Sequence, residues 1–260
     1  MNALRPIDFG YPLTLSRNTD IPRFWMKKWF EWVDRGWLHA PHPTTGLPAV
    51  WSLKPEDVHS LVWWSKDYRR FLAHPRREEL DAYRQVFCMT ITGYPEWEPK
   101  VPGLEVQLEN FAAMVQTYGA DKMQWRYSPV PMDWSRFEEI ALAMSDLGIT
   151  ECYYSFLHSG SHMPETRSIE ERKEITLQMA ARLELLGIGL RGCWDDEQFM
   201  DLPNCAPARC VDAAKIGQLY GLEKREYATE SKCGCTTSIE VASQKLLPCP
   251  HACEYCYASE

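Results

Sequence analysis

The sequence predicts an α/β protein, a partial (β/α)6 barrel with a C-terminal cysteine-rich tail. Short β-rich runs alternate with helical patterns between residues 13 and 193, and this alternation is typical of parallel strands joined by helical crossovers. Five of the ten cysteines fall in the last 28 positions, among glycines and prolines, where regular core packing is not expected. A doubly wound parallel sheet is the alternative arrangement of the same elements.

Six runs are predicted to be strands because they are short and rich in β-branched, aromatic and aliphatic residues. They cover residues 13–16, 61–64, 86–92, 123–127, 152–156 and 188–193. The clearest predicted helices cover residues 104–118, 133–147, 168–187 and 211–220. Asp133 is placed to cap the second of these helices, Ser168 and Glu171 form a capping box for the third, and Gly187 can end it.

Beyond Asn204 the strand–helix alternation stops, apart from the last predicted helix. We therefore expect two parts. The barrel occupies residues 1–203, and residues 204–260 form an appendage that packs on it. In a barrel of this type the chemistry takes place where the strands end. Polar residues expected there are Ser16, Arg17, Asn18, Asp20, Ser65, Lys66, Thr92, Arg126, His158, His162, Asp195 and Asp196.

The composition is that of one folded core, with 45% hydrophobic and 25% charged residues in a chain of 260. A net charge of -8 provides no field that attracts a phosphate backbone, which disfavours nucleic-acid binding. No apolar run approaches the roughly 20 residues of a membrane span, and the N-terminus lacks a secretion signal. We therefore expect a cytoplasmic protein with no membrane partner, whose cysteines are reduced thiols.

The chain ends in a C-x3-C-x2-C motif made by Cys249, Cys253 and Cys256, with Tyr255 directly before the third cysteine. Three thiolates on one tight loop can bind three irons of a cubane 4Fe–4S cluster and leave the fourth iron open. Such an iron can chelate the amino and carboxylate groups of S-adenosylmethionine. The alternative is a structural zinc site, completed by His251 or by a cysteine of the upstream C-G-C sequence.

The motif resembles the signature of radical S-adenosylmethionine enzymes, which usually lies near the N-terminus. Its position at the C-terminus resembles an atypical branch, a bacterial family of unknown function whose members end in CGC, a spacer and CxHGCxYCYA. The matching segments are residues 16–22, 52–57, 63–66, 90–94, 125–127, 210–212, 233–235 and the terminal motif. The chain departs from the family pattern at Asn18, Ser128, Glu240, Ala242 and Ala252, which bear on substrate contacts more than on the cluster.

The resemblance implies that the tail folds back and places its 4Fe–4S cluster over the mouth of the barrel. It nominates Ser16, Arg17, Lys66, Thr92, Arg126 and Tyr255 as residues around the cofactor. Lys66 and Arg126 are the expected partners of the S-adenosylmethionine carboxylate, although each can instead be part of a structural ion pair. Tyr255 can also shield the cluster from solvent.

The C-G-C sequence supplies two further thiols on a sharp turn. Together with two cysteines of the body they can complete four ligands for an auxiliary cluster or a zinc ion. This second set consists of Cys193, Cys210, Cys233 and Cys235. Substrate binding, or a role as ordinary reduced thiols, is the alternative for these residues.

Two reactions follow from an iron–sulfur cluster with S-adenosylmethionine. One is formation of a 5′-deoxyadenosyl radical that acts on an unknown substrate as a lyase or mutase. The other is transfer of the 3-amino-3-carboxypropyl group to a nucleophile. The resembling family includes the radical enzyme of arsinothricin biosynthesis, which implies transfer to trivalent arsenic, with arsenite held by thiols such as Cys88, Cys152 and Cys193. A flavodoxin or ferredoxin is the expected reductant.

Overall fold

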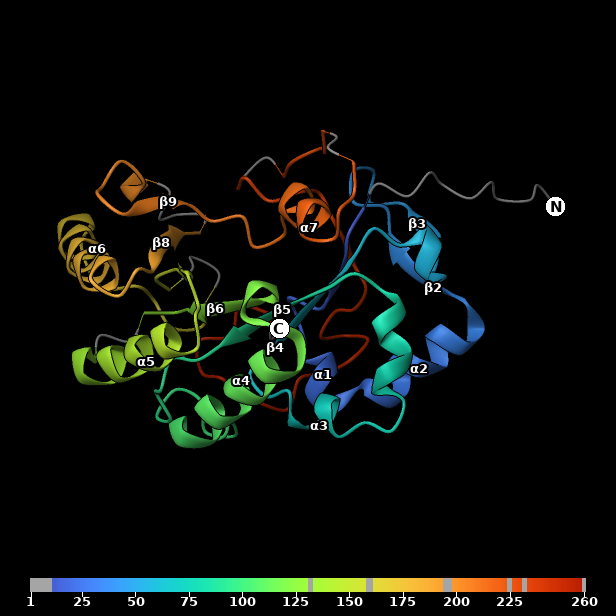
Figure 1. Ribbon diagram of the computed structural model, residues 1–260, viewed down its shortest axis with the longest axis horizontal. Helices are drawn as coiled ribbons and strands as arrows, with labels where there is room; N and C mark the ends of the chain where they lie inside the picture. Colours follow the sequence, from blue (N-terminus) through green and yellow to red (C-terminus); the bar gives the residue numbers. More distant parts are fainter. Residues whose placement is uncertain are drawn as a thin grey trace.

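The computed structural model describes residues 11–130, 133–157, 161–193, 198–223, 226–230 and 233–258. Within these ranges the main element is a sheet of eight parallel strands in the order β10-β1-β4-β5-β6-β7-β8-β9 (Figure 1). A separate antiparallel hairpin is formed by β2 and β3. His158, Asp195 and Asp196, expected at strand ends, lie outside the described residues.

The strands of the sheet are short. They are β1 (Leu13–Leu15), β4 (Leu61–Ser65), β5 (Gln85–Thr90), β6 (Met123–Tyr127), β7 (Glu151–Tyr154), β8 (Gly189–Gly192), β9 (Cys205–Pro207) and β10 (Ile239–Glu240). The hairpin strands are β2 (Trp37–Pro41) and β3 (Pro48–Ser52). The α-helices are α1 (Ile21–Phe24), α2 (Met26–Arg35), α3 (Arg69–Leu72), α4 (Leu104–Tyr118), α5 (Trp134–Asp146), α6 (Ile169–Glu184) and α7 (Ala213–Leu219). Short 3-10 helices cover Pro55–Asp57, Arg77–Ala82 and Ala120–Lys122.

All six predicted strands are confirmed, with ends that differ by no more than two residues. From β1 to β9 the strands follow one another in chain order, without the reversal that defines a doubly wound sheet, so that alternative is wrong. The hairpin, the edge strands and helices α1 to α3 were not predicted. β9 and β10 have three and two residues, which is too short for a recognisable strand pattern.

The four predicted helices are confirmed, and local capping explains where they begin. The Asp133 carboxylate accepts a hydrogen bond from the Arg136 amide at the start of α5. Ser168 and Glu171 form the predicted capping box of α6. Gly187 follows the end of that helix with a left-handed φ of 70°, which a glycine adopts without the steric cost of a Cβ.

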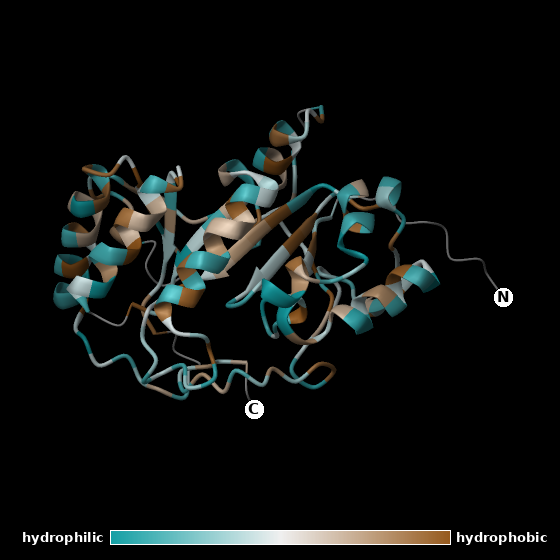
Figure 2. Ribbon diagram, turned by 60° about the horizontal axis from the view of Figure 1, so that its bottom comes forward, coloured by the Kyte–Doolittle hydropathy of each residue, from teal (hydrophilic) through white to brown (hydrophobic). Residues whose placement is uncertain are grey.

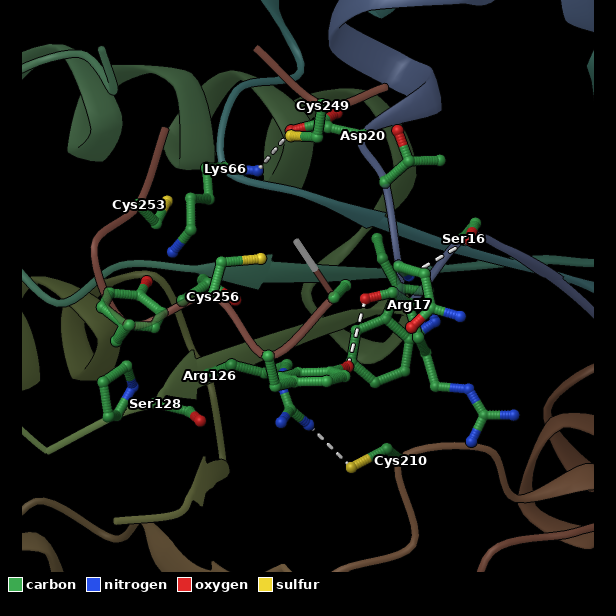
Figure 3. A pocket seen from close by; sticks show the side chains of 18 of the residues that line it. Ser16, Arg17, Asp20, Lys66, Arg126, Ser128, Cys210, Cys249, Cys253 and Cys256 are labelled. Atoms are coloured by element: carbon green, nitrogen blue, oxygen red, sulfur yellow. Dashed lines mark hydrogen bonds between the residues drawn. The ribbon is translucent and has the colours of Figure 1, made fainter. Parts of the chain in front are cut away.

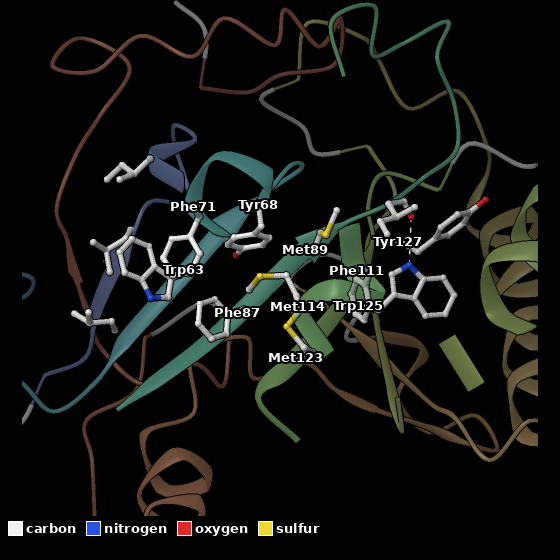
Figure 4. Close-up of a cluster of buried hydrophobic side chains, with 14 of the residues drawn as sticks. Trp63, Tyr68, Phe71, Phe87, Met89, Phe111, Met114, Met123, Trp125 and Tyr127 are labelled. Carbon is white, nitrogen blue, oxygen red and sulfur yellow. Dashed lines mark hydrogen bonds between the residues drawn. The ribbon is translucent and has the colours of Figure 1, made fainter. Parts of the chain in front are cut away.

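The two faces of the sheet bury different partners. On one face the side chains of Trp63, Phe87 and Trp125 form part of a large aromatic core (Figure 4). Trp63 packs on rings of α2 and α3, Phe87 on a ring of α4, and Trp125 on a ring of α5. On the opposite face Val62, Val86 and other strand residues pack against α7 and the C-G-C segment. Figure 1 shows α7 on the other side of the strands from α4 and α5, which agrees with these two clusters.

Strand β10 determines where the tail of the chain lies. It pairs in parallel with β1, with Ile239 opposite Leu13 and Glu240 opposite Thr14. Because parallel strands end at the same edge of a sheet, the residues that follow β10 begin at the edge where β1 and β4 end. Figure 2 shows the C-terminal segment running along that edge.

The segment after residue 203 thus supplies β9, α7 and β10 as well as the tail, and the division of the chain at this residue stays a prediction. None of the helices in the described ranges is long and apolar enough to cross a membrane.

Candidate functional site

A cavity of about 520 Å³ lies at the carboxyl ends of the strands (Figure 3). Residues at or just after the ends of β1, β4, β5, β6, β7 and β8 form its wall, and the C-terminal tail covers it. Ligands of parallel α/β proteins bind at this edge, where the strand ends present side chains from several segments. Pockets for small molecules have volumes of about 300–1,000 Å³, so this cavity is of the right size for one.

The cavity brings together nearly all of the predicted site residues. Its lining includes Ser16, Arg17, Lys66, Arg126, Tyr255, Cys193, Cys210, Cys233, Cys235, Cys249, Cys253 and Cys256. Seven of the ten cysteines of the chain therefore face one space, although they come from widely separated segments. Cys88 and Cys152 are buried within strands and are not part of this lining.

His162, expected at a strand end, is not part of the lining. Among the residues predicted around the cofactor, Thr92 is the one that does not line the cavity. It is buried, and its Oγ1 has no hydrogen-bond partner within the described ranges. β5 ends at Thr90, and the chain turns at Gly93, whose φ is 68°. Because the chain leaves the sheet here, Thr90 rather than Thr92 contributes to the wall of the cavity.

Ser16 and Arg17 bind the segment that leads into the tail. Ser16 Oγ donates a hydrogen bond of 2.9 Å to the carbonyl of Ala242. The Arg17 guanidinium forms ion pairs with Glu230 at 3.1 Å and Glu240 at 3.2 Å. These contacts join the end of β1 to the spacer before the terminal motif, so both residues hold the tail in place, and their predicted role toward the cofactor remains a prediction.

A buried pair between Asp20 and His251 fixes the loop that carries the terminal motif. Asp20 Oδ2 lies 2.8 Å from His251 Nε2, and both side chains are almost fully buried. The same carboxylate accepts hydrogen bonds from the Ser65 hydroxyl and the Lys66 amide. His251 Nδ1, at the opposite side of the ring, has no partner within the described ranges.

Lys66 forms a second buried ion pair, with Glu98. Its Nζ lies 2.7 Å from Glu98 Oε1, and the Tyr255 hydroxyl donates to the same carboxylate oxygen. Burial would lower the pKa of Lys66, but the charges of Glu98 and Cys253 raise it by more, so the amine is a cation. Lys66 therefore forms the structural ion pair that was the alternative to cofactor binding. A cofactor carboxylate would have to share the Lys66 ammonium with Glu98.

Polar groups lie beside the sulfurs of all three terminal thiols. The His251 amide donates to Cys249, and the Tyr255 hydroxyl contacts Cys253. Gln244 Nε2 lies 4.0 Å from Cys256 Sγ, while its Oε1 accepts from the Cys249 amide at 2.7 Å. Burial raises the pKa of Cys249 to about 12 and that of Cys253 to about 11, with Lys66 opposing the rise at Cys253.

Arg126 lies at the second set of thiols. Its Nη1 donates to Cys210 Sγ at 2.7 Å, and its guanidinium stacks over the Trp64 ring with 4.7 Å to the centroid. Burial would lower the pKa of Arg126, but the neighbouring thiols, Cys210 first, raise it. The pKa of Cys210 is lowered by hydrogen bonds from Cys193 and Cys235 and by Arg126.

Within the described ranges no three His, Cys, Asp or Glu side chains are already arranged around the position of a single metal ion. The second set of thiols nevertheless forms a continuous row. Cys210 lies close enough to Cys193 and Cys235 for each to affect its pKa, and Cys235 lies equally close to Cys233.

Among the polar residues of this site that the sequence did not indicate, three form contacts with predicted site residues or with the terminal motif. They are Glu98, Glu230 and Gln244. Glu98 is 2% exposed, whereas Glu96 in the same loop has a side chain that is 60% exposed, and nothing in the local sequence separates the two. Gln244 lies five residues before Cys249, and this proximity to the motif was the one available signal.

No curated protein matches this chain, and no solved structure matches it. A family model described as a domain of unknown function, DUF1848, matches residues 13–258, which is almost the whole chain and includes both sets of thiols. The chain belongs to the DUF1848 family.

Proposed function

We propose that this protein is a radical S-adenosylmethionine enzyme that transfers the 3-amino-3-carboxypropyl group to a small thiophilic substrate, such as trivalent arsenic. The observation that carries the proposal is that all three thiols of the C-x3-C-x2-C motif line one cavity at the carboxyl ends of a parallel sheet. The six predicted strands stand side by side in chain order, which supports the partial (β/α)6 barrel of such enzymes.

The residues around the terminal motif fit a 4Fe–4S cluster. Cys249, Cys253 and Cys256 provide three soft ligands, and two of the sulfurs have donors beside them, the His251 amide at Cys249 and Gln244 Nε2 at Cys256. A cubane places its ligand sulfurs around a core of several atoms, so these thiols need not converge on one point as they would for zinc. When bound at these thiols, such a cluster would supply an electron to the sulfonium of S-adenosylmethionine, and the electron would be returned in the course of the transfer.

Two buried cations on the wall of the cavity are suited to the cofactor carboxylate. Arg126 uses one guanidinium N–H on Cys210, and a guanidinium carries five donors in a planar fork that suits a carboxylate. Lys66 stands beside Cys253 and keeps its charge through Glu98. We assign Arg126 as the main partner because its planar fork keeps further N–H donors beyond the one on Cys210, whereas the single ammonium of Lys66 is paired with Glu98.

The extra thiols on the cavity wall favour transfer to a soft substrate over hydrogen abstraction from an organic one. A row of four thiols suits trivalent arsenic, which binds sulfur preferentially. The overall transfer balances: the bond from sulfur to the aminocarboxypropyl carbon breaks and a carbon–arsenic bond forms. Methylthioadenosine leaves, the sulfonium is reduced to a thioether, and arsenic is oxidised from the trivalent to the pentavalent state.

The test is product analysis by mass spectrometry on anaerobically reconstituted protein. The protein is reduced with dithionite and mixed with S-adenosylmethionine, with and without arsenite. We expect methylthioadenosine and an arsenic compound that carries the aminocarboxypropyl group. 5′-Deoxyadenosine in place of methylthioadenosine would contradict the transferase assignment. A colourless protein that holds zinc and forms neither product would contradict the radical S-adenosylmethionine assignment.

A further inference from the structure

Four thiols outside the terminal motif meet at the wall of the cavity. Cys193 follows β8 directly, Cys210 precedes α7, and Cys233 and Cys235 come from the C-G-C turn. All four line the cavity and belong to or pack against one buried cluster, with neighbouring thiols in the order Cys193, Cys210, Cys235, Cys233. Cys210 and Cys235 are each 3% exposed, so the middle of the row is shielded from bulk water.

Backbone hydrogen bonds hold the segments that carry these thiols. The Cys193 amide donates to the Tyr154 carbonyl at 3.0 Å. The Thr236 amide, directly after the C-G-C turn, donates to the carbonyl of Val211 at 2.7 Å. Gly234 fits closely against a neighbouring side chain, since a Cβ at this position would lie 3.3 Å from Arg209 Nε. Three segments that are distant in sequence are thus held together at this point of the fold.

Two guanidinium groups lie beside the row. The Arg126 guanidinium, 8% exposed, donates to Cys210 Sγ at 2.7 Å, and a buried cation needs an anionic partner. The Arg17 guanidinium lies near enough to interact electrostatically with Cys235. A thiolate is the form of cysteine that binds metal, and buried cysteines that serve only as small apolar residues have no such cations beside them.

We propose that Cys193, Cys210, Cys233 and Cys235 form a second site, which binds one soft, thiophilic ion of the class of zinc(II) or trivalent arsenic. Four thiolates satisfy tetrahedral zinc, and three satisfy trivalent arsenic. Binding requires the thiols at the two ends of the row to turn inward around the ion, because the four do not yet converge on one point. The site is independent of whether the terminal motif holds a cluster.

The test uses a variant in which Cys249, Cys253 and Cys256 are all replaced by serine, so that the second site is observed alone. Anaerobic titration with Co²⁺ is followed by thiolate-to-cobalt charge-transfer absorption. We expect one ion per chain, displaced by zinc. Cys210→Ser and Cys235→Ser are each expected to weaken binding by at least about 100-fold. Loss of a ligand should cost more than loss of a residue that only hydrogen-bonds to a ligand, which weakens metal binding by about 10–100-fold. Cys205→Ser, at a thiol in β9 outside the cavity, is the matched control and keeps full affinity.

Mapping of cysteine alkylation in the unchanged chain gives a second measurement, which does not depend on the folding of any variant. Zinc is expected to protect all four thiols, and arsenite three of them. Both results support the site and distinguish a metal ion from a metalloid substrate. The proposal is overturned if the four thiols are alkylated equally with and without either ion, or if cobalt binds as tightly after Cys210→Ser as before it.

Discussion

Replacement of Glu98 by glutamine is expected to destabilise the protein by leaving a buried ammonium without its counter-charge. The side chain of Glu98 is 3% exposed and that of Lys66 is 15% exposed, with 2.7 Å between Oε1 and Nζ. Removing one partner of a buried ion pair costs about 3–5 kcal/mol. Because Lys66 keeps some contact with water and glutamine can still accept a hydrogen bond, we expect a loss near the lower limit, about 3 kcal/mol.

The assay is the free energy of unfolding in urea, followed by tryptophan fluorescence under anaerobic conditions. Glu96→Gln is the matched control, because Glu96 lies in the same loop and forms an exposed pair with Arg136 at 3.4 Å. An exposed pair of this kind contributes at most about 1 kcal/mol. Adding Lys66→Met to Glu98→Gln removes the unpaired charge and is expected to restore part of the loss. The reasoning is refuted if Glu98→Gln and Glu96→Gln have equal effects.

Three further predictions concern other parts of the molecule. Ala252 has a left-handed φ of 54°, so Ala252→Gly is expected to raise the unfolding free energy by about 0.5–1 kcal/mol. Ala242→Gly, which relieves no left-handed φ, is the control and is expected to lower it. Burial would raise the pKa of Glu151, but hydrogen bonds from Lys215 and Tyr153 and the charges of Lys215 and Arg191 lower it by more, so the pKa lies below 4.5. The stability that this carboxylate contributes is present above the unfolded pKa of 4.5 and is lost as the pH falls. Glu151→Gln is therefore expected to lower the unfolding free energy at pH 7 and to lower it progressively less below about pH 4.5. The check is urea unfolding of both proteins at pH 7 and below about pH 4.5. Cys253→Ala is expected to reduce the bound iron to the background of unreconstituted protein, while Cys205→Ser keeps the wild-type iron content.

The parts of the fold that were predictable depend on local chemistry. Ser168 and Glu171 specify the start of α6 through contacts within four residues, and the strand runs are recognisable by composition alone. The terminal thiols were identified by their spacing. For the second set, the C-G-C pair was grouped in the sequence analysis with Cys193 and Cys210, and all four thiols line the same cavity.

The parts that were not predictable depend on contacts between distant segments. β10 has two residues, yet its pairing with β1 decides which edge of the sheet the tail covers. Glu98 and Glu96 are chemically identical, and only the position of Lys66 and Tyr255 makes one of them a buried anion. Thr92 was expected near the cofactor because β5 was predicted to extend two residues further than it does.

The most direct test of the central claim, that the terminal thiols hold a cluster with an open iron, is electron paramagnetic resonance of the reduced protein. Spectra are recorded before and after addition of S-adenosylmethionine. We expect a reduced 4Fe–4S signal that changes when S-adenosylmethionine binds and that is absent from Cys253→Ala. A wild-type protein without an iron–sulfur signal, or a signal that S-adenosylmethionine leaves unchanged, would contradict it.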